Sequence, residues 1–116
     1  MAVDRRNDPR SPIHSLTPVP VVFSGRVQGT GWLYDISLRG CKIRATVTPS
    51  LGASVTLRLS LDQQGPPLAI EEGVVGWTIP NRYFGVKFIR VKPNYQEALE
   101  RYIASAATMP AHKVVR

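Results

Sequence analysis

Short runs in which apolar and polar residues alternate recur along this chain, and glycine- or proline-containing turns separate them. In the clearest run, residues 55–61, every second residue is valine or leucine, and the residues between them are threonine, arginine and serine. A period of two is the signature of a strand with one buried and one exposed face. Further runs of this kind cover residues 19–27, 31–34, 41–45, 68–79 and 83–91. The pattern therefore predicts six short strands.

The period changes once, near the C-terminal end. From residue 94 to residue 106 apolar residues recur at steps of three and four, which is the spacing of one helical stripe. Asn94 suits the N-cap of this helix, and Glu97 could complete a capping box. We expect the helix to cover part of the core of the sheet. Six strands and one closing helix favour a mainly β fold: a small six-stranded antiparallel barrel of Greek-key type with one C-terminal α-helix.

Glycines within this pattern predict two local structures, a hairpin turn and a bulge or bend. The sequence Gln-Gly-Thr-Gly at residues 28–31 predicts the hairpin turn between the first two strands. Gly73 and Gly76 lie inside the run at residues 68–79, where interior glycines are typical of a bulge or bend.

The 116 residues suit one domain. Residues 1–18 combine proline and arginine with few large apolar side chains and predict a flexible N-terminal arm, whereas residues 19–107 hold the barrel and its helix and residues 108–116 a disordered tail. Without an apolar run of about twenty residues we expect no membrane insertion. Cys41 is the only cysteine and the N-terminus has no apolar leader, so we expect a cytoplasmic protein.

The charge balance favours an anionic partner, although it also promotes solubility. Lysine and arginine number 15 against 8 acidic residues, for a net charge of +7. Three arginines, Arg5, Arg6 and Arg10, lie in the arm, and the last two form an Arg-x-x-x-Arg motif. In an extended segment their Cα atoms can be at most about 13–14 Å apart. Two such guanidinium groups can grip opposite sides of a small dianion.

A polar turn, Asp-Ile-Ser-Leu-Arg-Gly at residues 35–40, joins the second and third predicted strands. Asp35 can accept hydrogen bonds from paired N–H donors, and Ser37 can donate or accept, so the turn could read the polar edge of a flat ligand. The alternative is a structural turn in which both side chains bond neighbouring backbone amides. The residues of the turn alone leave both interpretations open.

The sequence gives little support for a catalytic site or a metal site. The two histidines, His14 and His112, lie in opposite tails, and Cys41 lies on the apolar face of a predicted strand. We therefore expect no metal site, no catalytic residue, no cofactor and no enzymatic activity. Trp77 and Tyr83 could stack on bases together with Phe84 and Arg82, but we interpret most of these aromatic residues as barrel core and do not expect nucleic acid as a partner.

Together, the two motifs and the strand pattern resemble the PilZ domain family. The resemblance combines Arg6-x-x-x-Arg10 in the arm with Asp35-x-Ser37-x-x-Gly40 between the second and third strands. Nearly the whole chain is covered, because the later strands and the closing helix also follow the family pattern. Either motif alone is weak, whereas both in this order on this strand pattern form a specific signature.

The resemblance implies a receptor for the bacterial second messenger cyclic di-GMP. By analogy, Arg6 and Arg10 would bind the phosphates and guanine edges, and Asp35 and Ser37 would bond guanine. Gly40 would let the backbone turn close to the nucleotide.

The positions beside the two motifs carry further implications. Arg5 would be compatible with a stacked ligand dimer. Arg39 departs from the small residue of many relatives and would be an additional phosphate contact or face the solvent.

Three functions follow as alternatives from the residues and the resemblance. In the first, cyclic di-GMP orders the arm over the barrel, and the new surface signals to an unidentified effector protein. In the second, the barrel is a protein-interaction adaptor without ligand binding. In the third, it is a small basic barrel that binds RNA or single-stranded DNA through surface aromatic residues and arginines.

Overall fold

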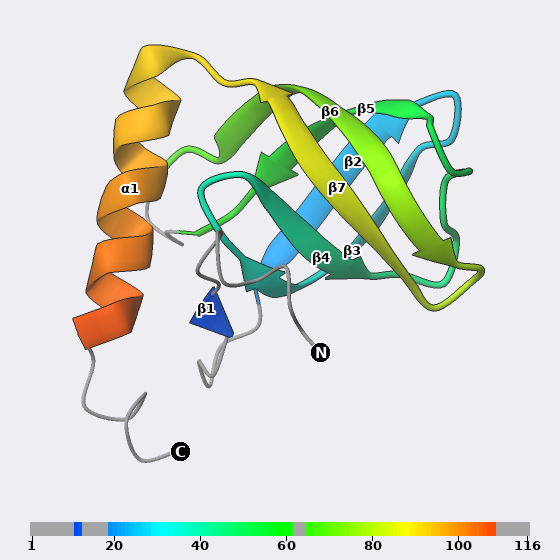
Figure 1. Cartoon of the computed structure of the whole chain (residues 1–116), viewed down its shortest axis with the longest axis horizontal. Coiled ribbons are helices and arrows are strands. Elements are labelled where there is room, and N and C mark those ends of the chain that lie inside the picture. Colours follow the sequence, from blue (N-terminus) through cyan, green and yellow to red (C-terminus); the bar gives the residue numbers. More distant parts are fainter. Residues whose placement is uncertain (1–10, 13–18, 62–64, 109–116) are drawn as a thin grey trace.

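The computed structural model of the chain describes residues 11–12, 19–61 and 65–108. Six strands form a closed antiparallel barrel, in which β3 joins β2 on one side and β4 on the other (Figure 1). Around the barrel the order is β3-β2-β5-β6-β7-β4, and the β3–β4 pairing closes it. The strands are β2 (Pro20–Gly25), β3 (Gly29–Ile36), β4 (Gly40–Arg44), β5 (Ser54–Leu59), β6 (Leu68–Ile79) and β7 (Tyr83–Arg90).

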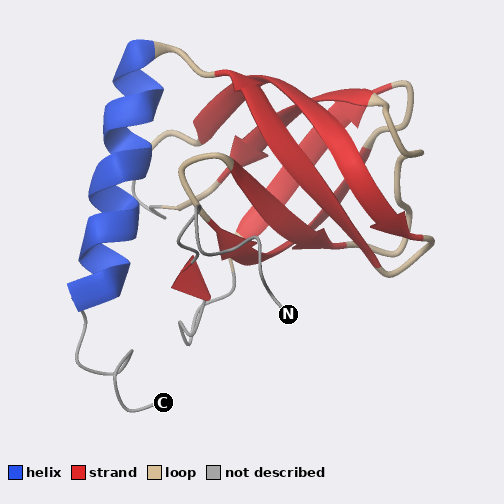
Figure 2. Cartoon of the chain, in the orientation of Figure 1, coloured by secondary structure: helices blue, strands red, loops and turns tan. Residues whose placement is uncertain are grey.

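Helix α1 (Pro93–Thr108) follows the last strand, and most of the described chain is strand (Figure 2). The predicted fold, a six-stranded antiparallel barrel with one C-terminal helix, is confirmed.

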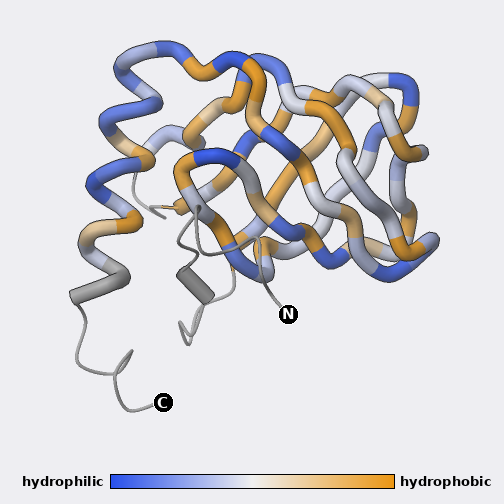
Figure 3. Tube along the Cα trace, viewed as in Figure 1, coloured by the Kyte–Doolittle hydropathy of each residue, from blue (hydrophilic) through white to orange (hydrophobic). Residues whose placement is uncertain are grey.

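Alternate residues of each strand point into a single core, as the period of two predicts. Along β5, Val55, Leu57 and Leu59 are buried. Figure 3 shows the same alternation of apolar and polar positions along the strands. Phe23 and Phe84 meet edge to face inside the barrel with their ring centroids 5.0 Å apart, a favoured geometry for aromatic pairs.

Helix α1 lies against one end of the barrel, and the β6–β7 turn lies at the other end (Figure 1). Leu99 is fully buried, and Tyr95 and Tyr102 pack against the core from the same face of the helix. The expected cover of the core by this helix is therefore confirmed. Burial of Tyr102 raises the pKa of its phenol above the ordinary value because the phenolate would lose its hydration.

The start of α1 differs from the prediction. The helix begins at Pro93, and the Gln96 amide donates to the Lys92 carbonyl at 2.8 Å. Asn94 therefore lies inside the first turn, and the predicted Asn94 N-cap is wrong. Proline suits the first helical position because its missing N–H would have no partner there and its φ is already helical.

The glycine expectations had different outcomes. The register of β6 shifts next to Gly73 and Gly76, which confirms the predicted bulges. The predicted turn at residues 28–31 is wrong, because β3 already begins at Gly29. Gly31 serves the pairing of β3 with β4: a Cβ at this position would collide with the carbonyl oxygen of Arg44.

A short strand precedes the barrel. Strand β1 (Ser11–Pro12) pairs antiparallel with the end of β3, with Ser11 opposite Ile36 and Pro12 opposite Asp35. The arginines of the predicted arm, Arg5, Arg6 and Arg10, lie outside the described residues, as do both histidines and residues 109–116. In the described part of the chain, no helix combines the length and the apolar character needed to cross a bilayer.

Candidate functional site

The turn between β3 and β4 forms a corner of the barrel, which we define as residues 35–40. It lies at the end of the barrel that carries α1, and β1 pairs with β3 beside it (Figure 1). Strand β1 also contacts α1. Three segments that are distant in sequence therefore meet around this turn.

Ser37 holds the turn together from inside. Its side chain is fully buried. The hydroxyl accepts hydrogen bonds from the amides of Arg39 and Gly40, both at 3.2 Å, and donates to the Gly40 carbonyl at 3.3 Å. The Ser37 amide donates to the same carbonyl at 2.8 Å. The hydroxyl thus makes the bonds of the structural turn that the sequence left open as an alternative.

Gly40 is required by the packing of β4 against β7. A Cβ at position 40 would collide with the carbonyl oxygen of Val86, and the carbonyl of Arg39 accepts from the Phe88 amide at 2.7 Å. The end of the turn is therefore fastened to β7, and its backbone has little freedom to shift.

Asp35 lies at the edge of the corner and is half-buried. It stands opposite Pro12 on β1 and opposite Lys42 on β4. Leu38 and Arg39 form the exposed tip of the turn. Of the sequence-predicted site residues, the structure thus brings Asp35, Ser37, Arg39 and Gly40 together, while the arginines of the arm belong to the part of the chain that is not described.

A second cluster of functional side chains lies on the outside of the barrel. We call it the basic–aromatic face and define it as Trp32, Tyr34, Lys42, Arg44, Trp77, Ile79, Arg82 and Tyr83. The cross-strand register places most of these side chains in two neighbouring rows. Trp32, Arg44, Tyr83 and Ile79 follow one another across β3, β4, β7 and β6, and Lys42, Gly85 and Trp77 form the next row.

The interpretation of most of the aromatic residues Trp77, Tyr83 and Phe84 as barrel core is wrong: Phe84 is buried in the core, but Trp77 is exposed and Tyr83 is half-buried. The bulge between Val75 and Trp77 reverses the direction of the side chains, so that Trp77 points outward with 39% of its surface exposed. A Cβ at Gly85 would collide with the indole, so the ring lies over this glycine. Sequence reasoning also missed Trp32 and Tyr34. The available signal was their separation by two residues, which places both side chains on one face of the strand.

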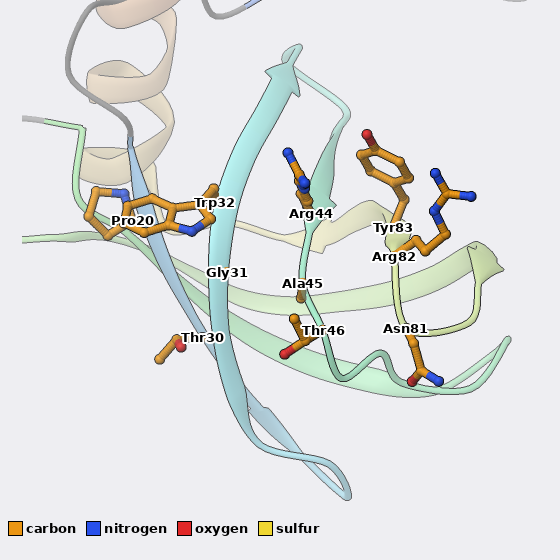
Figure 4. Close-up of a pocket in the computed structure, with 10 residues that line it drawn as sticks. All are labelled: Pro20, Thr30, Gly31, Trp32, Arg44, Ala45, Thr46, Asn81, Arg82 and Tyr83. Atoms are coloured by element: carbon orange, nitrogen blue, oxygen red, sulfur yellow. The ribbon is translucent and has the colours of Figure 1, made fainter.

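An open groove of about 690 Å³ lies at one edge of the basic–aromatic face. Figure 4 shows Trp32 beside Pro20 on one side, Arg82 and Tyr83 on the other, and Arg44 between them. In the part of the chain that the structure describes, no three histidine, cysteine or acidic side chains come together as a metal site.

Comparisons with known proteins identify the fold. The family profile described as PilZ domain matches residues 4–105 of this chain. The PilZ domain with c-di-GMP of YcgR from Escherichia coli has a TM-score of 0.71 and 20% identity over 97% of this chain and 98% of that chain. The MrkH–c-di-GMP complex from K. pneumonia has a TM-score of 0.70 and 21% identity over 97% and 57%.

The Bacillus subtilis inhibitor of motility MotI/DgrA has a TM-score of 0.69 and 19% identity over 90% of this chain. The chain spans about half the length of that protein, 52%. Curated protein sequences give no match. At these identities the structures show a shared fold, and the family profile covers nearly all of the sequence. This chain therefore belongs to the PilZ domain family.

Proposed function

We propose that this chain is a receptor for cyclic di-GMP, bound between the corner and the arginines Arg5, Arg6 and Arg10. In this proposal the guanidinium groups bind the phosphates and the O6/N7 edges of the guanines. Asp35 accepts hydrogen bonds from the N1–H and N2–H₂ groups of a guanine. Arg39, exposed at the tip of the turn, is an additional contact.

One observation carries the proposal: β1 pairs with the end of β3. Ser11 directly follows Arg10 in the sequence and stands opposite Ile36, between Asp35 and Ser37. The segment that follows the Arg-x-x-x-Arg motif thus lies at the polar corner. A ligand that bridges both motifs needs this proximity, and Figure 1 shows how β1 runs beside the β3–β4 turn.

The relatives support the same ligand. Two of the similar structures, the PilZ domain of YcgR and MrkH, are complexes with c-di-GMP. Both cover 97% of this chain.

Ser37 and Gly40 have a supporting role in this proposal. Because the Ser37 hydroxyl is used within the turn, a direct bond to guanine would replace one of the present bonds. Gly40 keeps the turn fastened to β7. Both residues therefore hold Asp35 and Arg39 in place for the ligand.

In this proposal the signal to an effector protein arises when the ligand orders the arm. Ligand binding would close the arm over the corner and create a surface for an effector protein, at the cost of conformational entropy. The protein would act in the cytoplasm as a signalling receptor and would not be an enzyme.

Calorimetry on the full chain tests the ligand. We expect heat of binding at micromolar cyclic di-GMP. Arg10→Ala should weaken binding by about 10- to 150-fold, because one charge-assisted contact contributes about 1.5–3 kcal/mol. Arg26→Ala, at an exposed bend away from the corner, is the matched control and should bind like the wild type. No heat with the wild type, or equal affinity for Arg10→Ala and the wild type, would refute the proposal.

A further inference from the structure

The basic–aromatic face exposes several large side chains on the outside of the barrel. Trp32 is 51% exposed, Tyr34 49% and Ile79 47%. Neighbouring exposed aromatic and aliphatic side chains on a small protein commonly mark an interaction surface. The groove of this face is lined by residues of the β2–β3 hairpin, the end of β4 and the β6–β7 turn and includes no residue of the corner, whereas Lys42 on the same face stands opposite Asp35.

The aromatic rings of this face surround a cation of the protein itself. The Lys42 ammonium lies 4.4 Å from the ring centroid of Tyr34, 4.8 Å from that of Tyr83 and 5.7 Å from that of Trp77. Tyr34 and Tyr83 meet edge to face at 74° with centroids 5.6 Å apart. The three rings therefore direct their faces toward Lys42, and the two tyrosine rings are nearly perpendicular to each other.

The charge of this face is positive. Arg44 and Arg82 are exposed beside the groove, and their guanidinium groups form no ion pair with any described residue. In the described part, Asp35 is the acidic residue that borders the face, opposite Lys42. The remaining described acidic residues are Glu71, Glu72, Glu97 and Glu100.

These features distinguish two classes of partner. Single-stranded nucleic acid stacks its bases on free ring faces. Here Lys42 occupies faces of three rings, and the two tyrosines are nearly perpendicular, so the rings do not form a flat stacking platform. Tryptophan, tyrosine and arginine together are the residues that dominate protein–protein binding energy. The positive charge selects an acidic partner.

We propose that the basic–aromatic face docks an acidic polypeptide segment of a partner protein. Carboxylates of the segment pair with Arg44 and Arg82, and an apolar side chain of the segment enters the groove beside Trp32. The groove includes no residue of the corner, and the docking is tested without cyclic di-GMP, so the two proposals can fail separately.

A peptide-display selection tests this docking site with a defined probe. A random library of 12-residue peptides is selected on the immobilised full-length protein without cyclic di-GMP, and the affinities of enriched peptides are measured by fluorescence anisotropy. We expect peptides rich in aspartate and glutamate that also carry an apolar residue. Arg44→Glu and Trp32→Ala should each weaken their binding at least tenfold. Arg58→Glu makes the same charge change on exposed β5 and should weaken binding by less than threefold.

Three results would overturn the proposal. The first is an absence of enriched peptides, or enriched peptides without excess acidic residues. The second is equal loss of binding in Arg44→Glu and Arg58→Glu, which would indicate attraction to net charge alone. The third is tighter binding of a labelled 20-nucleotide single-stranded RNA than of any peptide, lost in Trp32→Ala. If Trp32→Ala fails to fold, Arg82→Glu at the exposed β6–β7 turn replaces it in the same comparison.

Discussion

The corner and the basic–aromatic face share strands β3 and β4 but use polar side chains in opposite ways. At the corner, Ser37 is buried and its hydroxyl bonds the backbone of its own turn. On the face, Arg44 and Arg82 are exposed and form no ion pair with a described residue. The motif that resembles a binding signature is thus partly a folding device, whereas side chains outside any motif are free to bind.

This difference is expected from the cost of burying polar groups. A buried hydroxyl must satisfy its hydrogen bonds within the protein, so its removal affects stability. Exposed cations such as Arg44 and Arg82 contribute little to stability, and their removal should mainly affect binding. Substitutions in the two regions should therefore separate along these two measurements.

The largest expected effect lies at the corner, in Gly40→Ala. The added methyl group would collide with the Val86 carbonyl oxygen, and backbone on both strands would have to move. We expect a loss of about 3 kcal/mol in the free energy of unfolding, the upper part of the range for overpacked sites. Gly76→Ala is the matched control, because a Cβ there meets nothing within 4 Å. Denaturant unfolding with equal stability of the two variants would contradict this account of the corner.

An intermediate effect is expected for Ser37→Ala. The Arg39 and Gly40 amides would lose their shared acceptor, and at least one of them is buried. We expect a destabilisation of about 1–3 kcal/mol. Ser54→Ala, at an exposed position of β5, should change stability by less than about 0.5 kcal/mol. Calorimetry separates the two roles of Ser37: a variant that keeps wild-type stability but loses cyclic di-GMP binding would show that Ser37 acts on the ligand alone.

The smallest effect is expected on the face, in Lys42→Gln. The variant loses the cation among three rings, which should cost about 1 kcal/mol in thermal or denaturant unfolding. Lys42→Arg keeps the positive charge near the rings and should retain most of the stability. Lys87→Gln, at an exposed position of β7, is the control. If Lys87→Gln lowered the free energy of unfolding as much as Lys42→Gln does, the three rings would contribute nothing to the stabilisation by Lys42.

Much of the fold was predictable because it depends on local pattern. The strand predicted at residues 68–79 and the bulges at Gly73 and Gly76 agree with the structure. The predicted turn at residues 28–31 was wrong because Gly31 is required by its neighbour on β4, and a single strand does not reveal its neighbours.

The site was predictable only in part for the same reason. Both motifs could be found in the sequence, but the direction of Trp77 depends on one extra residue in the β6–β7 register. The period of two predicts which side chains point inward only as far as a bulge. The extra residue of the bulge shifts the alternation, so each later side chain points to the opposite face from the one predicted. The outward position of Trp77 beside Tyr83 therefore could not be predicted without the pairing of β6 with β7.

The amino-acid pattern alone predicts the class of fold, the closing helix and the two motifs in the order of the family. Alternation, helical stripe and motif spacing are properties of neighbouring residues, which the chain carries before it folds. Three features depend on how the folded strands meet: the Ser37 hydroxyl bonds its own turn, β1 pairs beside Asp35, and three rings surround Lys42 on the outside. These features arise where strands distant in sequence meet, and their register settles which side chains are buried and which remain free to bind.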